Sequence, residues 1–212
     1  MALPLRLFVG LGNPGRRYAS TRHNAGAWFV DRLARLLDLE LRSESRFQSL
    51  VARGRAPDGG DFRLALPQSY MNESGNPVAS LARYYRIPPA EILVAHDELD
   101  LKPGSVKLKL GGGSAGHNGL NDVVEQLGVG DFWRLRIGIG HPRDAELAEA
   151  EVVDYVLHPP RAEDKAQIDD AIARALAVWP DLVSGDTERA MLALHTRRSA
   201  ARPSGGEGSA GA

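Results

Sequence analysis

Residues 6–33 read RLFVGLGNPGRRYASTRHNAGAWFVDRL, and this stretch decides the fold class. Residues 7–11 are an apolar run without a polar break, which is typical of a strand buried on both faces. A turn of sequence GNPG ends the strand, because proline removes a ladder donor and glycine allows a sharp bend. After a polar loop, a helical pattern begins at Asn24, a candidate N-cap. Asn13 and His23 therefore lie at the mouth of a strand–loop–helix unit, where α/β proteins usually place their sites.

The rest of the chain alternates between strand and helix patterns. Strands are predicted over 47–54, 62–67, 92–95, 106–110 and 133–139, helices over 78–85, 123–127 and 168–179, and an irregular acidic segment over 144–160. The turn sequence PDGG between the first two of these strands predicts a hairpin. We therefore predict an α/β fold, a single three-layer domain with a mixed β-sheet flanked by helices. The domain is expected to span residues 1–198, followed by a disordered polar tail at 199–212.

The composition argues against several classes of protein. The 212 residues include no cysteine, so there is no disulfide framework and no thiolate nucleophile. We find no signal peptide and no apolar run of membrane-spanning length, so we expect a cytoplasmic protein without membrane association. The net charge of −1 does not indicate a nucleic-acid binder, but residues 1–143 hold 19 Lys and Arg against 14 Asp and Glu, and residues 144–170 hold 2 against 9. This distribution suits either a local face for an anionic ligand or ordinary solvated charge.

Four cations alternate with apolar residues on two predicted strands. Lys107 and Lys109 lie on one strand, and Arg134 and Arg136 lie on the other. If the two strands are neighbours, the four cations share one face of the sheet. Beside the glycine-rich loop 111–116, Lys107, Lys109 and Arg136 would clamp phosphates, although an ordinary solvated face is the alternative.

Two short motifs suggest other functions. The sequence GLGNPG after the first strand matches a dinucleotide-binding fingerprint, but the predicted helix starts well beyond its last glycine, so the context fails. The sequence GGSAG matches the nucleophile elbow of serine hydrolases, with Ser114 as nucleophile. Its partners would be Asp144 or Asp154 and His158 or His195. The residues alone leave this serine esterase open as an alternative.

Histidine and asparagine residues at predicted strand and loop ends are the other candidates. The six histidines lack metal-binding spacing, so we expect no metal ion. His23 at a helix start and Asp97 at the end of another strand would together make a general base for activating water. Asn13, Asn72 and Asn118 would orient a carbonyl group and stabilise an oxyanion if they converge. Each of them also has a structural reading, since asparagine is a common turn residue.

Taken together, the motifs are familiar. The chain strongly resembles bacterial peptidyl-tRNA hydrolase over about residues 5–195, and the motifs follow in the family's order. They are FVGLGNPG at 8–15 with Tyr18, TRHNAG at 21–26, YMNESG at 70–75, HDELD at 96–100, the glycine-rich segment 111–119 and RLRIGIGHP at 134–142. The resemblance implies a cofactor-free, usually monomeric esterase that cleaves the bond between a peptide and the 3′ ribose of tRNA. This activity recycles tRNA from peptidyl-tRNA that ribosomes release prematurely.

The resemblance also implies roles for individual residues. His23 is the base that activates water, Asp97 orients it, and Asn13 completes the catalytic group. The residues implied to bind the peptide, the 3′ end or the tRNA are Tyr18, Tyr70, Met71, Asn72, Lys107, Lys109, Gly116, His117, Asn118 and Arg136. Among them the two lysines and the arginine contact tRNA phosphates, and Asn118 helps to hold the water. Segment 141–160 corresponds to a lid-like region over the cleft.

The sequence departs from the family's pattern at a few positions. Ser114 and Ala115 replace the His-Gly of some members, and Glu73 is a charge where an apolar residue often lies, a difference that bears on the fine peptide preference. A non-catalytic RNA-binding member of the family is the second hypothesis beside the hydrolase. Such a protein would have the same fold and the same cationic residues. The presence of both His23 and Asp97 argues against this hypothesis.

Overall fold

The computed structural model describes residues 3–145 and 152–196. Within them, one mixed sheet has the strand order β2-β3-β4-β1-β5-β7-β6. The strands are β1 (Leu7–Gly10), β2 (Arg42–Glu44), β3 (Ser49–Arg55), β4 (Asp61–Pro67), β5 (Ile92–Glu98), β6 (Val106–Leu110) and β7 (Trp133–Gly138). β1 lies between its parallel neighbours β4 and β5, and β7 continues the parallel part beside β5. β2, β3 and β6 pair antiparallel with their neighbours.

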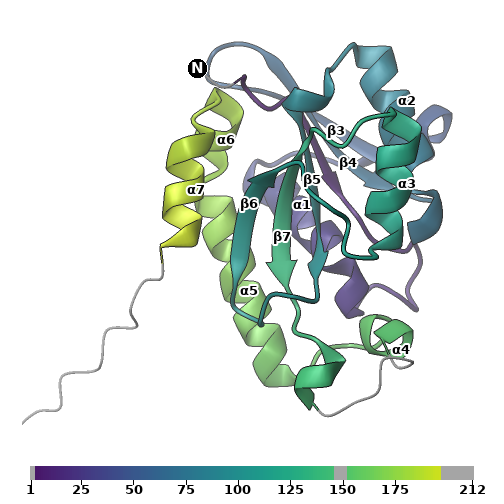
Figure 1. Cartoon of the computed structure of the whole chain (residues 1–212). Helices are drawn as coiled ribbons and strands as arrows, with labels where there is room; N and C mark the ends of the chain where they lie inside the picture. The colour runs from purple at the N-terminus through teal and green to yellow at the C-terminus, as the bar shows by residue number, and fades with distance from the viewer. Residues whose placement is uncertain (1–2, 146–151, 197–212) are drawn as a thin grey trace, which may run out of the picture.

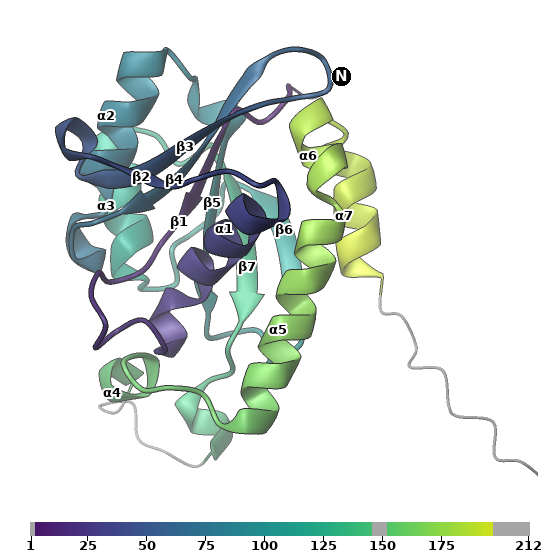
Figure 2. The same ribbon diagram turned by 180° about the vertical axis from the view of Figure 1, so that it is seen from behind.

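Helices cover both faces of this sheet, which confirms the predicted three-layer α/β fold (Figures 1 and 2). The α-helices are α1 (Ala25–Leu36), α2 (Gly75–Tyr85), α3 (Asn118–Leu127), α4 (Val152–Val156), α5 (Ala162–Ala177), α6 (Trp179–Ser184) and α7 (Thr187–His195). Helices α2 and α3 contribute to the apolar core on one face, and α1, α5, α6 and α7 contribute to the core on the other. None of the helices in the described ranges is long and apolar enough to cross a lipid bilayer.

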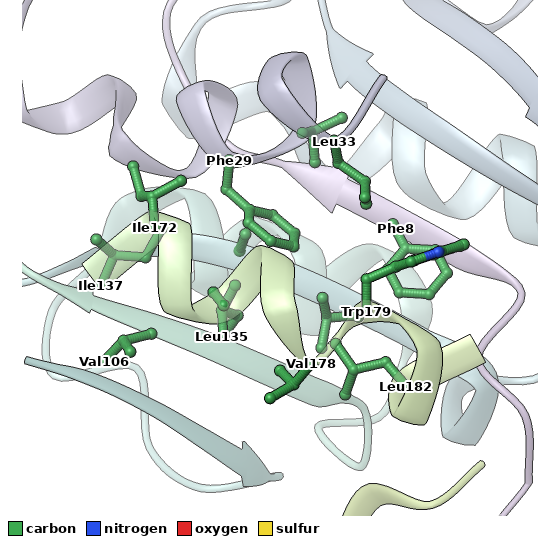
Figure 3. Packing of buried hydrophobic residues seen from close by; sticks show 14 of the residues in the cluster. Phe8, Phe29, Leu33, Val106, Leu135, Ile137, Ile172, Val178, Trp179 and Leu182 are labelled. Carbon is green, nitrogen blue, oxygen red and sulfur yellow. The ribbon is translucent and has the colours of Figure 1, made fainter. Parts of the chain in front are cut away.

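The apolar run of β1 serves both cores. Phe8 lies in the core beneath α1 and α6, with its ring centroid 4.9 Å from that of Trp179 (Figure 3). Leu7 and Val9 point to the opposite core, and all three side chains are fully buried. Because side chains alternate along a strand, an uninterrupted apolar run is needed at a position covered on both sides. Full burial of the Phe8 ring contributes roughly 1.5–3 kcal/mol.

Helix α1 begins in direct contact with the central strands. A Cβ atom at Gly26 would lie 2.1 Å from the carbonyl oxygen of Ala95, and one at Gly10 would lie 2.5 Å from the carbonyl oxygen of Gly26. Only residues without a side chain allow this approach. It brings the residues just before α1 to the carboxyl end of β5, where His96 and Asp97 lie.

Some local predictions are wrong. Asn24 does occupy the position before α1, but its side chain makes no capping hydrogen bond, because it bonds to Asn13 instead. The segment 144–160 is not wholly irregular: it includes the end of a 3₁₀ turn (η5, Pro142–Ala145) and helix α4. The short strand β2 was not predicted, since its three residues are exposed and carry no apolar pattern.

Other predictions fall on parts of the chain that cannot be compared. Residues 146–151 of the acidic segment lie outside the described residues. The same holds for the predicted domain boundary at 198 and the predicted tail at 199–212. The helix predicted over 168–179 is divided in the structure, because α5 ends at Ala177 and Pro180 lies in the first turn of α6.

Candidate active site

The centre of the site is a buried carboxylate at the carboxyl end of β5. Asp97 accepts a hydrogen bond from Nδ1 of His23, at 2.9 Å to Oδ1 and 3.1 Å to Oδ2. His23 lies in the 3₁₀ turn η1 (Arg22–Asn24) that leads into α1, 74 positions away in the chain. The side chain of Asp97 is 2% exposed and that of His23 is 12% exposed. Since Nδ1 donates its hydrogen to the carboxylate, Nε2 of the neutral ring is left as an acceptor.

A second imidazole shares the same carboxylate. Nε2 of His117 lies 2.9 Å from Oδ1 of Asp97. Nδ1 of His117 accepts a hydrogen bond from the backbone N–H of Leu120, at 3.3 Å, so the His117 side chain caps helix α3. Because Nδ1 is an acceptor, the proton of the neutral ring must lie on Nε2, and His117 donates to Asp97. The backbone of α3 therefore determines the tautomer of His117.

The electrostatics of this cluster keep Asp97 ionised. Burial by itself would raise the pKa of the Asp97 carboxyl, but the two histidines and their hydrogen bonds hold it far below its usual range. Burial lowers the pKa of His23, but the charge of Asp97 and its hydrogen bond outweigh this, and the net pKa is raised above 6.5. The carboxylate thus favours a proton on His23 in the way that general-base catalysis requires.

A third histidine lies behind the pair. His96 is buried, its Nδ1 lies 2.7 Å from the carbonyl oxygen of Asp97, and its Nε2 has no hydrogen-bond partner among the residues that the structure describes. Burial is the main cause that lowers the pKa of His96 to about 3, and the nearby His117 ring adds to this lowering. His96 is therefore neutral at physiological pH.

A cleft of about 300 Å³ opens in front of His23 and Asp97. Its other lining residues are Glu98, Leu99, Ser114, Ala115, Gly116, His117, Asn118, His141, Val152, Val153 and Val156. One side is polar and comes from the end of β5 and the glycine-rich loop, and the other includes valines of α4. Of the implied site residues, the cleft brings together His23, Asp97, Gly116, His117 and Asn118.

Asn13 organises the loop on the other side of His23. Its backbone N–H and carbonyl group both bond to the side-chain amide of Asn24, at 2.9 Å each. Its side-chain Oδ1 accepts from the backbone N–H of Met71 at 2.8 Å. Met71 in turn lies against Gly119, since a Cβ at Gly119 would be 2.5 Å from the Met71 sulfur. Because Oδ1 is occupied, Nδ2 is the donor that Asn13 has left.

The other implied residues of this region are more exposed. The rings of Tyr18 and Tyr70 meet edge to face with centroids 6.5 Å apart, and Tyr70 is 58% exposed. Asn72 is exposed in the turn η3 (Met71–Glu73). None of these three residues, nor Asn13 or Met71, lines the 300 Å³ cleft.

The two cation-bearing strands are indeed neighbours. β6 and β7 pair antiparallel, with Lys107 opposite Arg136 and Lys109 opposite Arg134. Arg134 does not share the solvated face, however, because it is 2% exposed and donates to the carbonyl oxygen of Gly113. Three cations are therefore accessible rather than four. Arg136 is partly engaged, since its Nε donates to Glu98 at 2.8 Å, whereas the exposed Lys107 and Lys109 have no ion pair within the described ranges.

Comparisons with known proteins agree with this geometry. A family described as peptidyl-tRNA hydrolase matches residues 7–202. The chain belongs to that family. It is 54% identical over 196 residues to the peptidyl-tRNA hydrolase of Azoarcus sp. (strain BH72), covering 92% of this chain and 87% of that protein. It is also 54% identical over 198 residues to that of Nitrosomonas europaea, covering 93% of this chain and 99% of the relative.

Solved structures agree with the family assignment. A crystal structure of peptidyl-tRNA hydrolase in complex with N-propanol superimposes with a TM-score of 0.87 at 44% identity, covering 92% of this chain and 97% of the other. The crystal structure of the Acinetobacter baumannii peptidyl-tRNA hydrolase superimposes with a TM-score of 0.85 at 45% identity, covering 90% of this chain and 94% of the other. The protein is thus a peptidyl-tRNA hydrolase enzyme, and the resemblance noted in its motifs is confirmed.

The serine alternative finds no support in the geometry of the hydrolase. Ser114 lines the cleft, but no hydrogen bond joins its hydroxyl to a histidine in the part of the chain that the structure describes. His158 bonds to the carbonyl oxygen of Asp154, and His195 accepts from the backbone N–H of Leu108 on β6. The side chain of Asp144 lies outside the described part of the chain.

The fold places three potential metal ligands together that sequence spacing did not reveal. Donor atoms of His23, Asp97 and His117 all lie within 4.8 Å of one another in the hydrolase. The hydrogen-bond pattern does not suit a metal ion, because Nε2 of His117 carries a proton as long as Nδ1 accepts from Leu120. We therefore assign the cluster to hydrogen bonding.

Sequence reasoning missed several residues of the cleft in the hydrolase. His96 and Glu98 flank Asp97 in the sequence, so their position at a strand end was the available signal. The link from His117 to Asp97 had no signal, because it depends on how loops meet in space, whereas the resemblance had already implied that segment 141–160, which includes α4, lies over the cleft.

The lowered pKa of His96 predicts how the stability of the folded protein changes as the pH falls. Its folded pKa of about 3 lies below the unfolded value of 6.5, so the unfolded state binds more protons between these values. Stability is therefore lost as pH falls from 6.5 towards 3. In His96→Leu this contribution is absent, so the stability difference between wild type and variant should shrink by about 2–3 kcal/mol from pH 7 to pH 4.5. Urea unfolding of both proteins at the two pH values measures this, and identical pH dependence would contradict it.

Proposed function

We propose that the hydrolase cleaves the ester bond between a peptide and the 3′ end of tRNA by direct attack of a water molecule, with His23 as the general base. The observation that carries this proposal is the pair of hydrogen bonds between Nδ1 of His23 and Asp97. They leave Nε2 of an imidazole on the cleft side as a proton acceptor whose tautomer is determined. No cofactor and no metal ion is needed for this chemistry.

The steps follow from this arrangement. Nε2 of His23 takes a proton from water while the water oxygen attacks the ester carbonyl carbon. Asp97 stabilises the imidazolium that forms. The tetrahedral intermediate then expels the 3′ oxygen of the ribose, which takes the proton from His23. An alkoxide leaves far more readily than an amide nitrogen, so a single base with polar donors suffices.

Amide groups are the proposed donors around the reacting carbonyl. Asn118 on the cleft wall would hold the water and the substrate. Asn13 would use its remaining Nδ2 donor, because its Oδ1 already accepts from Met71. Such donors stabilise the oxyanion more effectively when they are held in place before the reaction.

The remaining assigned residues would bind the rest of the substrate. Asn72 and Met71 lie on the Asn13 side, together with the aromatic pair Tyr18 and Tyr70. Gly116 lies in the glycine-rich loop of the cleft. His117, which donates to Asp97, would orient the carboxylate as well as border the substrate.

Lys107, Lys109 and Arg136 are proposed to contact tRNA phosphates. They share one accessible face near the cleft, and phosphate contacts add affinity without sequence specificity. This suits an enzyme that recycles tRNAs of many sequences from prematurely released peptidyl-tRNA. We further propose that the hydrolase acts as a monomer in the cytoplasm, with one catalytic domain over residues 1–198.

The first test removes the base. His23→Ala is expected to lower kcat by about 10²–10⁴-fold, because His117, the other imidazole bonded to Asp97, already uses its Nδ1 to accept from the Leu120 amide. The substrate is N-acetyl-aminoacyl-tRNA, and free aminoacyl-tRNA should remain uncleaved by wild type. His195→Gln is the matched control, since this histidine lies at the β6 edge. Turnover by His23→Ala close to that of wild type would exclude the proposed role.

The second test uses the pH dependence of kcat/KM. Because only neutral His23 is a base, activity should rise with pH through the His23 pKa, which lies above 6.5. In Asp97→Asn the carboxylate no longer raises this pKa while burial still lowers it, so the midpoint should move to lower pH. Rates measured from pH 5 to 9 at high enzyme concentration report both midpoints. A midpoint that stays in place in the variant argues against the pairing as the cause.

The third test addresses tRNA binding. Each of Lys107→Ala and Lys109→Ala should weaken binding of deacylated tRNA and reduce the slope of log Kd against log salt by about 0.7–0.9, the value for one lost phosphate contact. Arg35→Ala, which removes an exposed cation on α1, is the control and should leave the slope unchanged. Equal slopes in all four proteins would remove these lysines from the tRNA interface.

A further inference from the structure

We infer that Arg22 is a positioning residue, which fixes the catalytic turn to the end of helix α4 and thereby holds His23 in its productive orientation. This inference rests on the proposed role of His23 as base. Arg22 directly precedes His23 in η1, and its side chain contacts the end of α4 and the residues that follow this helix.

The guanidinium of Arg22 donates hydrogen bonds to several backbone carbonyl groups. Its Nη1 lies 3.2 Å from the carbonyl oxygens of Tyr155 and His158, and 2.9 Å from that of Pro159. In addition, its backbone N–H donates to the His158 oxygen at 3.1 Å. Both the main chain and the side chain of one residue are therefore attached to the same short segment.

The guanidinium is also buried and stacked. Arg22 is 6% exposed, and its Cζ lies 4.0 Å from the centroid of the Tyr155 ring. Asp164, in the first turn of α5, is the nearby carboxylate, at 3.8 Å from Nη2. A buried cation is costly to hold unless its surroundings are ordered around it, so the segment cannot shift freely relative to η1.

The attachment of Arg22 to the end of α4 affects two parts of the cleft lining. Three valines of α4, at 152, 153 and 156, line the same cleft as His23. Helix α4 has only five residues and depends on such tertiary contacts for its stability. Both views of the ribbon place α4 beside the chain that leads into α1 (Figures 1 and 2). A single side chain, that of Arg22, thus sets the positions of both His23 and the cleft-lining valines of α4.

A lysine would not replace this arrangement. Its single nitrogen lacks the planar face that stacks on Tyr155, and it is a more strongly hydrated charge. The geometry points to a requirement for arginine itself. Because substrate affinity is proposed to come from tRNA phosphates elsewhere, a loss at Arg22 should act on kcat rather than on KM.

The experiment compares Arg22→Met and Arg22→Lys with Arg32→Met. Arg32 on α1 pairs with Asp169 on α5, so this control also loses a link between α1 and the C-terminal helices, at a place outside the cleft lining. Measurements are kcat and KM on N-acetyl-aminoacyl-tRNA, Kd for deacylated tRNA, and amide hydrogen exchange over residues 152–159.

We expect Arg22→Met to lower kcat about ten-fold or more and Arg22→Lys about three-fold, with KM and Kd changed less than about three-fold. Exchange at 152–159 should speed up in these variants and not in Arg32→Met, whose kcat should stay within about two-fold of wild type. Folded Arg22→Met with wild-type kcat, or an equal loss of kcat in Arg32→Met, overturns the inference.

Two further outcomes are distinguishable. If Arg22→Met fails to fold, Arg22→Lys decides alone: a lowered kcat with unchanged KM supports the inference, and wild-type kcat overturns it. His23→Ala in the same assay tests the base role separately. If His23→Ala were fully active, the proposed mechanism would fail. The inference that Arg22 positions His23 for catalysis would then fail too, even if faster exchange at 152–159 in the Arg22 variants showed that Arg22 holds this segment.

Discussion

The interaction on which the rest depends is the sharing of one buried carboxylate by two imidazoles. Asp97 has almost no access to water, so its charge is tolerable only because His23 and His117 both donate to it. The hydrogen bond from Nδ1 of His23 leaves Nε2 of that ring as an acceptor. The tautomer of His117 is set by the Leu120 amide, which donates to its Nδ1. One carboxylate therefore orders two loops and α3.

Backbone packing makes this arrangement possible. The two glycines at positions 10 and 26 allow α1 to start against β1 and β5, so the turn that carries His23 meets the strand end that carries Asp97. The side-chain amide of Asn24 serves the Asn13 backbone rather than the helix end. Local helix capping is given up for a contact between loops, which is typical of a site whose geometry matters more than local stability.

In the proposed function, the charges for recognition and those for catalysis lie at separate places. Accessible cations on β6 and β7 lie outside the buried cluster, so their field can attract an anionic backbone without disturbing the pair of His23 and Asp97. Arg134 and Arg22, both buried, bind backbone carbonyl groups and order the loops around the cleft instead. Accessible and buried cations thus have different partners, which burial decides.

The sequence by itself determined the three-layer fold and the family, because alternating patterns and turn motifs are local and survive without coordinates. It also singled out His23 and Asp97, since both lie at element ends where α/β sites form. Only the tertiary structure decided that His117 donates to Asp97, that Arg134 is buried while Lys107 and Lys109 are exposed, and that Arg22 anchors the end of α4. The physical reason is that burial and hydrogen-bond partners belong to pairs of segments distant in the chain, and no local pattern encodes which of them meet.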